Sequence, residues 1–483
     1  MPRTVRFGGQ YAANAIMRQM RRLLTFLLAA ILLLPLLPAA PAGAAETPLR
    51  IAFIDSGIST KHVAEERVEP GKNYVFPEAD TRDRIGHGTA TAGLVLGSED
   101  QGVSGVCPEI TAVPLVVVDT YPTGGVKNGG PEALCQAMRD AVDLFDCRII
   151  NISLCTEEDS PELRSAAAYA EEHGAVVVAA VGNEGTEGPA FYPAAYDSVI
   201  AVGSSEGDHA AAFSQPGADL LAEGADLLAP TNKNRIQPAP VSGTSYSCAI
   251  VSGICARLLL CYPDLSPAEL REALYAMAED LLEPGFDAVS GWGRIPTDPA
   301  IPTPYLDVLE TGWSREGILY VTERGIMTGT GTGRFSPEGI LNRAMFVTIL
   351  YRMAGEPKTA QSSVFPDADG EAYYAPALAW AANGGLVQGY EDGSFGPEEP
   401  VTREQMTTLL WRLQGRPAGS GELSSFGDAD AVSDWARDAL AWAVGTGILS
   451  GKGDGNLDPR GIATREEAAQ LMRNFLERFG PSV

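Results

Sequence analysis

The sequence predicts an α/β domain with a mostly parallel sheet and helices on both faces, followed by an all-α repeat domain. In the first two thirds of the chain, short apolar segments alternate with helical patterns, and these segments are apolar on both faces. In the last third, related segments recur at a period of about 60 residues. A chain of 483 residues has room for about two to four domains.

Composition narrows the classes of partner. Hydrophobic residues make up 45% of the chain, enough for a sizeable core, and the formal net charge is −27. Nucleic acid is an unsuitable partner, because the binding of phosphates requires a basic face. The strong negative charge instead favours a soluble protein.

The N-terminus has the layout of a secretory signal peptide. Arg21 and Arg22 precede an apolar run at 23–37, and Ala42-Gly43-Ala44 forms an A-x-A cleavage site. The run is short and broken by proline, which suits a membrane span poorly, and an uncleaved anchor is the alternative. We therefore expect residues 1–45 to be a signal peptide. The mature protein is then secreted and is not an integral membrane protein.

The first elements of the mature chain place two polar residues where α/β domains build their sites. An apolar strand at 49–54 ends on Asp55, at the carboxyl end of a buried strand. A turn aspartate is the alternative for this residue. His87 lies between two glycines, which let a substrate approach closely, and it precedes a run of small residues that can pack as a helix.

Further strands and helices follow with the same alternation. The apolar strand at 175–181 ends in a Gly-Asn-Glu-Gly turn that contains Asn183. Ser160 caps a helix that runs to about residue 174, and Ser266 opens another with a capping-box pattern. We also expect buried strands at 110–118 and 148–154, shorter strands at 199–202 and 226–228, and a helix at 131–145.

Residues 242–253 deliver Ser245 to the start of a long helix that runs to about Tyr262. A hydroxyl at this position lies beside free backbone N–H groups and the positive end of the helix dipole, which suits the stabilisation of an oxyanion. A serine that merely caps the helix is the alternative. The nucleophile interpretation therefore requires a base, an orienting acid and a second oxyanion donor elsewhere in the chain.

These polar residues lie in segments that together resemble the subtilisin-like serine proteases, or subtilases. The order and spacing of the segments fit that family, and the resemblance covers about residues 48–298. The matching segments are Ile54–Gly57, Gly86–Thr89, Ala180–Gly185 and Gly243–Ser245.

The resemblance implies a serine endopeptidase that works through an acyl-enzyme. Ser245 would be the nucleophile, His87 the general base and then the acid, and Asp55 the residue that fixes the imidazole tautomer. Asn183 would donate its side-chain amide to the oxyanion, together with the backbone N–H of Ser245. An extended edge would pair with the substrate backbone, and it consists of Ser153, Leu154 and Cys155.

Several positions depart from the subtilase pattern. The run after Ser245 is Tyr-Ser-Cys-Ala, and Cys155 stands where glycine is usual, near the primary specificity pocket. Its thiol is either an inert small side chain, which we favour, or a regulatory group. A folding prosegment is expected in secreted relatives, yet few residues separate Ala45 from the first strand. The loop at 98–101 is compatible with structural calcium, and the chemistry itself requires no cofactor.

The seven cysteines all lie between residues 107 and 261. Because the number is odd, at least one thiol has no partner within the chain. Disulfides are allowed in an exported protein, and the pattern does not fix any pairing. The sequence has no C-x-x-C pair, so a zinc site is not expected.

The C-terminal third contains three copies of a helix, a glycine-rich loop and a second helix that begins near a Thr-Arg step. These copies resemble surface-layer homology (SLH) modules. The resemblance implies attachment to the wall or S-layer of a Gram-positive-type bacterium through anionic secondary cell-wall polysaccharide. An arginine recurs beside the helix start, where it could bind an anion or serve a structural purpose. These arginines are Arg343, Arg403 and Arg465.

Aromatic side chains also recur in the three copies. They could stack on sugar rings, but packing in the core is the favoured interpretation. In the first copy, Asn342 and Met345 replace a threonine and a glutamine or glutamate, so its groove is expected to bind weakly. One aromatic set is Tyr320, Trp380 and Trp442, and the other is Trp313, Tyr373 and Trp435.

Together the patterns predict a secreted, wall-attached serine endopeptidase that acts on proteins or peptides. The alternative is a non-proteolytic surface-layer protein with a protease-like body. The expected segments are a signal peptide at 1–45, a subtilisin-like catalytic domain at 46–298, a Pro-rich linker at 299–304, and SLH repeats at 305–356, 361–416 and 422–480.

Overall fold

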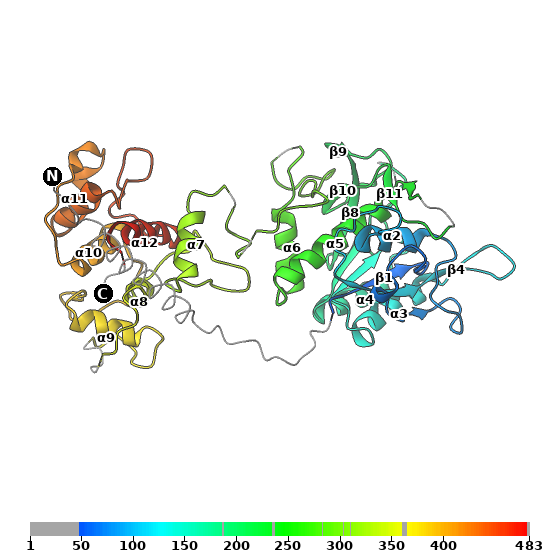
Figure 1. The fold of residues 1–483 in the computed structure, drawn as a ribbon, viewed down its shortest axis with the longest axis horizontal. Coiled ribbons are helices and arrows are strands. Elements are labelled where there is room, and N and C mark those ends of the chain that lie inside the picture. Colours follow the sequence, from blue (N-terminus) through cyan, green and yellow to red (C-terminus); the bar gives the residue numbers. More distant parts are fainter. Residues whose placement is uncertain are drawn as a thin grey trace, which may run out of the picture. The chain divides into compact units, whose positions relative to one another are not determined.

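The computed structural model describes residues 48–480, apart from 186–187, 234–236, 283, 303, 310 and 360–364 (Figure 1). The expected signal peptide lies outside the described residues and stays a prediction. Up to about residue 298 the chain forms a sheet covered by helices, and beyond it the regular elements are helices alone. Both parts of the predicted fold class are therefore confirmed.

The sheet of the first part of the chain is parallel along its main path. Its strands run in the order β10-β8-β7-β6-β1-β3-β2, and β9 pairs with β8 antiparallel. The central strands are almost wholly buried, as expected for a parallel sheet covered on both faces. The bounds are β1 Arg50–Asp55, β2 Lys72–Asn73, β3 Thr111–Val116, β6 Ile149–Ile152, β7 Val176–Ala180, β8 Val199–Glu206, β9 His209–Ala210 and β10 Leu220–Glu223.

The two faces of the sheet carry separate cores. Alternate residues of β1 point to opposite faces, so Ile51 and Phe53 join one core while Ala52 and Ile54 join the other. The first core is closed by α2 His87–Leu96, α5 Thr244–Cys261 and α6 Pro267–Ala276, and the second by α3 Gly130–Asp143 and α4 Pro161–Glu172. The caps predicted at Ser160 and Ser266 are present.

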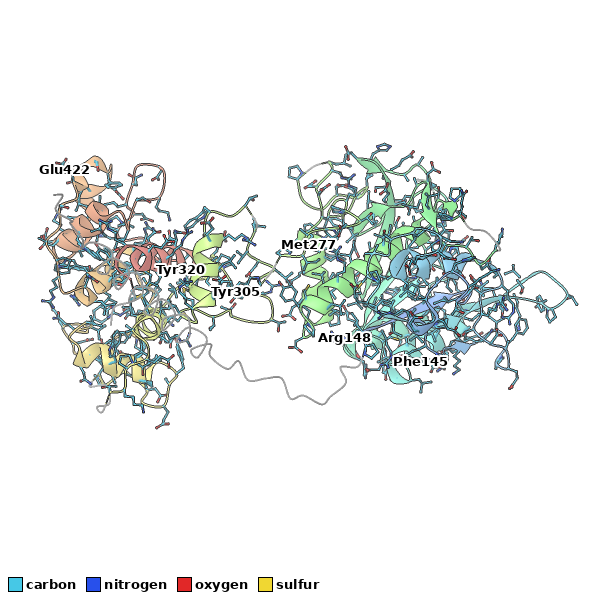
Figure 2. The ribbon with its side chains drawn as sticks, in the orientation of Figure 1. Phe145, Arg148, Met277, Tyr305, Tyr320 and Glu422 are labelled. Carbon is cyan, nitrogen blue, oxygen red and sulfur yellow. The ribbon has the colours of Figure 1, made fainter. Side chains whose placement is uncertain are left out.

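Arg148, just before β6, connects the sheet to the helices at one edge of the domain (Figure 2). Its guanidinium donates to the backbone carbonyls of Gly174, Pro263 and Leu265 at 3.0, 3.0 and 2.8 Å. These carbonyls follow α4 and α5, so one side chain fixes how both helices leave the sheet.

The sheet differs from the prediction at two short strands: one predicted strand lies outside it, and one of its strands was not predicted. A sheet strand is expected at 226–228, but β11 Leu227–Ala229 pairs antiparallel with β12 Ala239–Val241 outside the main sheet. The sheet instead gains β10, whose four residues are too few for a periodic pattern to stand out. The other short elements are β4 Val118–Thr120, β5 Val126–Asn128, and the 3-10 helices η1 Glu65–Arg67, η2 Leu423–Ser425, η3 Ala429–Ala431 and η4 Asp434–Ala436.

Helix α5 is the one helix of the described residues that is long and apolar enough to cross a membrane. Its side chains, however, lie inside the first core, between the sheet and α2. Burial within the domain thus accounts for its apolar composition.

Each C-terminal repeat is a pair of helices with a polar cap at the start of the second. The side chains of Asn342, Thr402 and Thr464 accept hydrogen bonds from backbone N–H groups three residues later. The helix pairs are α7 Arg315–Glu323 with α8 Arg343–Met353, α9 Ala375–Asn383 with α10 Arg403–Leu413, and α11 Arg437–Thr446 with α12 Arg465–Phe479.

The three repeats close into a ring of backbone hydrogen bonds. The N–H of Leu341 donates to the carbonyl of Ala463, Ala463 donates to Val401, and Val401 donates back to Leu341, at 3.1, 2.9 and 2.9 Å. Helix α12 also packs against α7, so the last repeat meets the first (Figure 1). The ring requires all three repeats, and one core cluster contains side chains from each of them.

Candidate active site

Asp55 and His87 are in direct contact at the end of β1. Nδ1 of His87 lies 2.8 and 2.9 Å from the two carboxylate oxygens of Asp55. The carboxylate is 1% exposed and also accepts hydrogen bonds from the backbone N–H of Ser56 and the hydroxyl of Thr91. A buried carboxylate on Nδ1 keeps the proton there, which leaves Nε2 free to act as a base.

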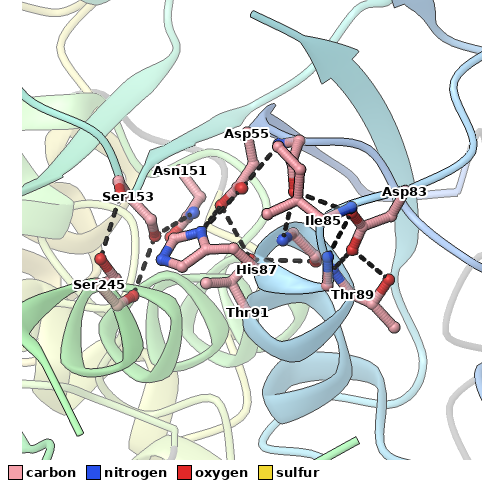
Figure 3. A network of polar contacts seen from close by, with 12 residues as sticks. Asp55, Asp83, Ile85, His87, Thr89, Thr91, Asn151, Ser153 and Ser245 are labelled. Atoms are coloured by element: carbon pink, nitrogen blue, oxygen red, sulfur yellow. Dashed lines mark hydrogen bonds and ion pairs between the residues drawn. The ribbon is translucent and has the colours of Figure 1, made fainter. Parts of the chain in front are cut away.

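Ser245 lies in the first turn of α5, on the other side of the imidazole from Asp55 (Figure 3). Its hydroxyl donates to the backbone carbonyl of Ser153 at 3.1 Å, and the Ser153 hydroxyl donates to the Ser245 carbonyl at 2.9 Å. The described residues show no hydrogen bond between Ser245 and His87. To donate to Nε2 of His87 instead of to the Ser153 carbonyl, the Ser245 hydroxyl would have to rotate. Hydrogen bonds between catalytic groups are often long or poorly aligned when no substrate is bound.

Asn183 follows β7 and is held by the residue before Ser245. Its side-chain oxygen accepts from the backbone N–H and the hydroxyl of Thr244 at 2.8 and 3.1 Å. Fixing the oxygen in this way turns the amide NH₂ outward, and Asn183 is exposed. Gly182 and Gly243, with φ of 112° and 148°, provide the turns that bring the two segments together.

A second carboxylate, which the sequence patterns did not single out, shapes the loop before His87. Oδ1 of Asp83 accepts from the N–H groups of Ile85 and Gly86 and from the hydroxyl of Ser56. Oδ2 accepts from both the N–H and the hydroxyl of Thr89 at 2.8 and 2.6 Å. Asp83 is 3% exposed, so its charge is held close to the imidazole.

The environment raises the pKa of His87 above its ordinary value. Burial alone lowers this pKa, but the charge and hydrogen bond of Asp55 and the charge of Asp83 raise it by more. The two carboxylates therefore make the imidazole a stronger base than an isolated histidine.

Asn151 was also missed, and it connects β6 with α5. This amide is fully buried, donates to the hydroxyl of Ser153 at 3.0 Å, and accepts from Ser252 at 3.0 Å and the Cys248 thiol at 3.3 Å. The available signal was a polar residue within the apolar strand Ile-Ile-Asn-Ile.

The residues that follow Ser245 have different surroundings. The ring of Tyr246 lies 5.7 Å from the His87 ring, centroid to centroid, at 45°. Ser247 is buried, contacts the hydroxyl of Ser204 at 2.8 Å and donates to the carbonyl of Ala222. The residues after Ser245 therefore both cover the imidazole and pack α5 against the sheet.

The expected substrate edge follows β6. Ser153 is buried, Leu154 half-buried and Cys155 exposed. Desolvation of the Cys155 thiol, with the charges of Glu184 and Glu157, raises its pKa. The thiolate is disfavoured at neutral pH, which agrees with an inert side chain. All seven cysteines are free.

The side chains of the loop at 98–101 contact other parts of the domain, and calcium binding there stays a prediction. The carboxylate of Asp100 lies 2.6 Å from Nδ1 of His62, and the side chain of Gln101 accepts from the backbone N–H of Thr231. Within the described ranges no group of three His, Cys, Asp or Glu side chains could hold a metal ion.

The geometry agrees with comparisons to known proteins. The subtilase family model matches residues 47–293. The chain belongs to the subtilase family. Subtilisin DY of Bacillus licheniformis is 33% identical over 48% of this chain and 84% of its own length. The thermophilic serine proteinase of Bacillus sp. strain AK1 is 32% identical over 51% of this chain and 59% of its own length. This subtilase is a serine endopeptidase.

The S-layer homology model matches the C-terminal part three times, at 304–345, 364–407 and 425–469. The surface-layer 125 kDa protein of Lysinibacillus sphaericus is 29% identical over 35% of this chain, but the match spans 14% of that protein. The subtilase thus carries SLH domains, which indicate association with a bacterial cell surface or S-layer.

The recurring arginines of the SLH domains connect neighbouring repeats. Nε of Arg343 donates to the Phe395 carbonyl at 2.8 Å, and Nε of Arg403 donates to the Leu457 carbonyl at 3.0 Å. Nε of Arg465 completes the cycle on the Phe335 carbonyl at 2.8 Å. A structural purpose is therefore present at every copy, whether or not the guanidinium also binds a ligand.

The two aromatic sets have different surroundings. Tyr320, Trp380 and Trp442 contact the shared core, as expected. For the other set, the core interpretation is wrong, because these side chains point to solvent. Trp313, Tyr373 and Trp435 are 62%, 61% and 53% exposed.

We predict that Asp83→Asn shifts the acid limb of the kcat/KM profile to lower pH. The substitution removes a charge that raises the pKa of His87, so the neutral base persists further into acid. Asp80→Asn is the matched control, since that exposed carboxylate pairs with Arg84. An unmoved acid limb in a folded Asp83→Asn enzyme would contradict the assignment.

Proposed function

We propose that this subtilase hydrolyses peptide bonds through an Asp55–His87–Ser245 triad and an acyl-enzyme. The observation that carries the proposal is the buried Asp55 carboxylate on Nδ1 of His87, with Ser245 at the start of α5 beyond the ring. A non-proteolytic protease-like body would have no need of this pairing.

The first half of the reaction forms the acyl-enzyme. Nε2 of His87 takes the proton of Ser245 as the hydroxyl attacks the substrate carbonyl, and Asp55 stabilises the resulting imidazolium. The imidazolium then gives that proton to the leaving amine as the peptide C–N bond breaks. In the second half, water attacks the acyl carbonyl while Nε2 takes its proton, and the proton returns to Ser245 as the new carboxyl group is released.

Two donors would stabilise the negative oxygen of each tetrahedral intermediate. One is the Asn183 amide NH₂, which Thr244 aims outward, and the other is the backbone N–H of Ser245. The substrate backbone would pair with Ser153, Leu154 and Cys155, which follow directly from β6. Accepting the substrate there leaves Ser245 beside its target.

We further propose that the enzyme is secreted and held at the wall by its SLH domains through an anionic secondary cell-wall polysaccharide. The support is one cavity lined by both the exposed ring of Tyr373 and the guanidinium of Arg465, since rings stack on sugars and guanidinium groups pair with acids. With a net charge of −27, local cationic sites are necessary for an anionic polymer to bind.

Ser245→Ala should abolish labelling by a fluorophosphonate, which bonds to an activated serine oxygen with loss of fluoride. Turnover should fall by about 10⁶-fold, the loss seen when the nucleophile of subtilisin is removed. The test is gel fluorescence of the purified chain, with Ser247→Ala as the control serine. Equal labelling of the Ser245→Ala protein, or none of the wild type, would contradict the proposal.

Asn183→Ala should lower kcat by about 10²–10³-fold with little change in KM, because the amide acts on the intermediate more than on bound substrate. That range is the loss observed when the oxyanion-hole asparagine of subtilisin, a member of the same family, is replaced. Steady-state kinetics on a peptide substrate would measure both constants. A change confined to KM would assign Asn183 to substrate binding instead.

Retention on purified bacterial walls should depend on their polysaccharide. We expect sedimentation of the full chain with intact walls, and about tenfold or greater loss after the polysaccharide is chemically removed. Walls carried through the same procedure without the removing reagent are the control. Equal retention on both would rule out the proposed anchor.

A further inference from the structure

The ring of SLH repeats forms equivalent grooves beside the loops between the two helices of repeats 1 and 3, and the corresponding region of repeat 2 is called the second groove. The first and third grooves each combine that loop, the second helix of the same repeat, the arginine of the preceding repeat and the exposed aromatic of the following one. The first groove has a cavity of about 250 Å³. Its main residues are Met327–Thr330, Met345, Arg352, Tyr373 and Arg465.

The third groove, beside repeat 3, is occupied by its own carboxylates. Oε1 of Glu467 lies 2.7 Å from Arg403 and 3.1 Å from Lys452, so both cations already face an anion. Glu338 and Glu466 also line this cavity of about 810 Å³. An acidic ligand would have to displace Glu467 from a buried ion pair, which is strongly unfavourable.

The second groove covers its arginine with an aromatic ring. The guanidinium of Arg343 lies 4.8 Å from the centre of the Tyr390 ring, and the Tyr390 hydroxyl donates to Glu399 at 2.6 Å. The equivalent of Tyr390 in the first repeat is the small Thr330. A bulky ring and a carboxylate beside Arg343 make this groove less open to an anion.

The first groove carries positive charge without a lining carboxylate. Arg352 and Arg465 line it, and none of its lining residues is Asp or Glu. Helix α8 has no acidic residue in its first turn, whereas α10 and α12 have Glu404, Glu466 and Glu467 there. The positive end of α8 is therefore not compensated from within.

Two carboxylates near the first groove are engaged elsewhere. Asp307 accepts from the N–H groups of Phe335 and Ser336, an arrangement that the other two repeats share. Glu398, close to Tyr373, accepts from the side chain of Asn342 at 2.9 Å. Neither forms an ion pair with the groove arginines in the described part of the chain.

Arg352 is the cation best placed to meet a ligand. Among the described residues no hydrogen bond or ion pair engages its guanidinium, and it lies half-buried close to Tyr373. Arg465 uses part of its guanidinium on the carbonyls of Phe335 and Thr328, which fixes its orientation and leaves further N–H groups.

We propose that the first groove is the one that binds the anionic polysaccharide, and that Glu467 closes the third groove to it. One acidic sugar unit would place its carboxylate on Arg352 and Arg465 and its ring on Tyr373. The cavity is smaller than the roughly 300–1,000 Å³ of pockets for drug-sized ligands, which suits a single sugar unit. This inference rests on the proposed wall anchoring.

The inference reverses the expectation that repeat 1 binds weakly. That expectation followed from Asn342, which replaces a threonine, and from Met345, which replaces the Gln405 and Glu467 of the other repeats. In the structure the same replacement removes the internal anion that would otherwise compete for Arg465. The loss of a polar residue from the motif therefore opens the site.

Met345→Glu tests the assignment, because it installs in the first groove the carboxylate that occupies the third. The new glutamate should pair with Arg465, and a glutamate at the third helical position after Asn342 suits the helix cap. We expect the variant chain to bind polysaccharide-bearing bacterial walls about tenfold more weakly than the wild type, or weaker still, in co-sedimentation. Gln405→Glu, with the same charge change in the second groove, should stay within about twofold of wild type.

A second pair of variants separates the grooves without changing charge. Tyr373→Ala should weaken wall binding by about tenfold, whereas Trp313→Ala, an equally exposed ring in the third groove, should not. Circular dichroism and peptidase activity confirm the fold of each variant. The groove assignment would be overturned if the wild type binds walls and Met345→Glu and Gln405→Glu weaken that binding equally. It would also be overturned if only Trp313→Ala weakens wall binding. A wild-type chain that does not bind walls would instead overturn the anchoring.

Discussion

The position of Ser245 depends on how α5 lies over the sheet, and the buried amide of Asn151 fixes the position of the helix. Ser252 and Cys248 are four residues apart on one face of α5, and both donate to the same amide oxygen. Leaving this buried amide without its partners would cost about 1–3 kcal/mol, so a shifted or rotated helix is disfavoured. Since the amide NH₂ also holds Ser153, one residue of β6 aligns both the helix and the segment that meets Ser245.

Sequence could predict the residues whose signals are local. Asp55, His87 and Ser245 each stand at a strand end or helix start with small or glycine neighbours, and the parallel sheet then brings such ends together. The contacts of Asn151 join residues 97 and 101 positions away, and those of Asp83 compensate several loop N–H groups at once. Periodicity contains no information about such pairings. The sequence alone therefore shows Asn151 only as a polar residue in a strand and Asp83 only as an aspartate in a loop.

The SLH ring gives the recurring arginines a structural purpose that does not depend on a ligand. In a closed ring every copy must supply the same connections, so the ring alone can explain a residue that all copies share. Arg343, Arg403 and Arg465 meet that requirement through identical Nε contacts to the next repeat. Ligand preference must then come from positions where the copies differ. The acidic content of the second helix's first turn is such a position, because it decides whether the arginine beside it faces an internal anion.

The residues after Ser245, which depart from the family pattern, point to different sides of α5. Ser247 and Cys248 point into the sheet, where their polar atoms are satisfied, while Tyr246 remains on the side of His87. A large ring against the imidazole excludes water, and such desolvation lowers the pKa of a histidine. The pKa of His87 is nevertheless raised, because Asp55 and Asp83 outweigh its burial. Asp83, which holds the loop before His87, therefore adds to the effect of Asp55 and helps to keep the imidazole a strong base beneath the ring of Tyr246.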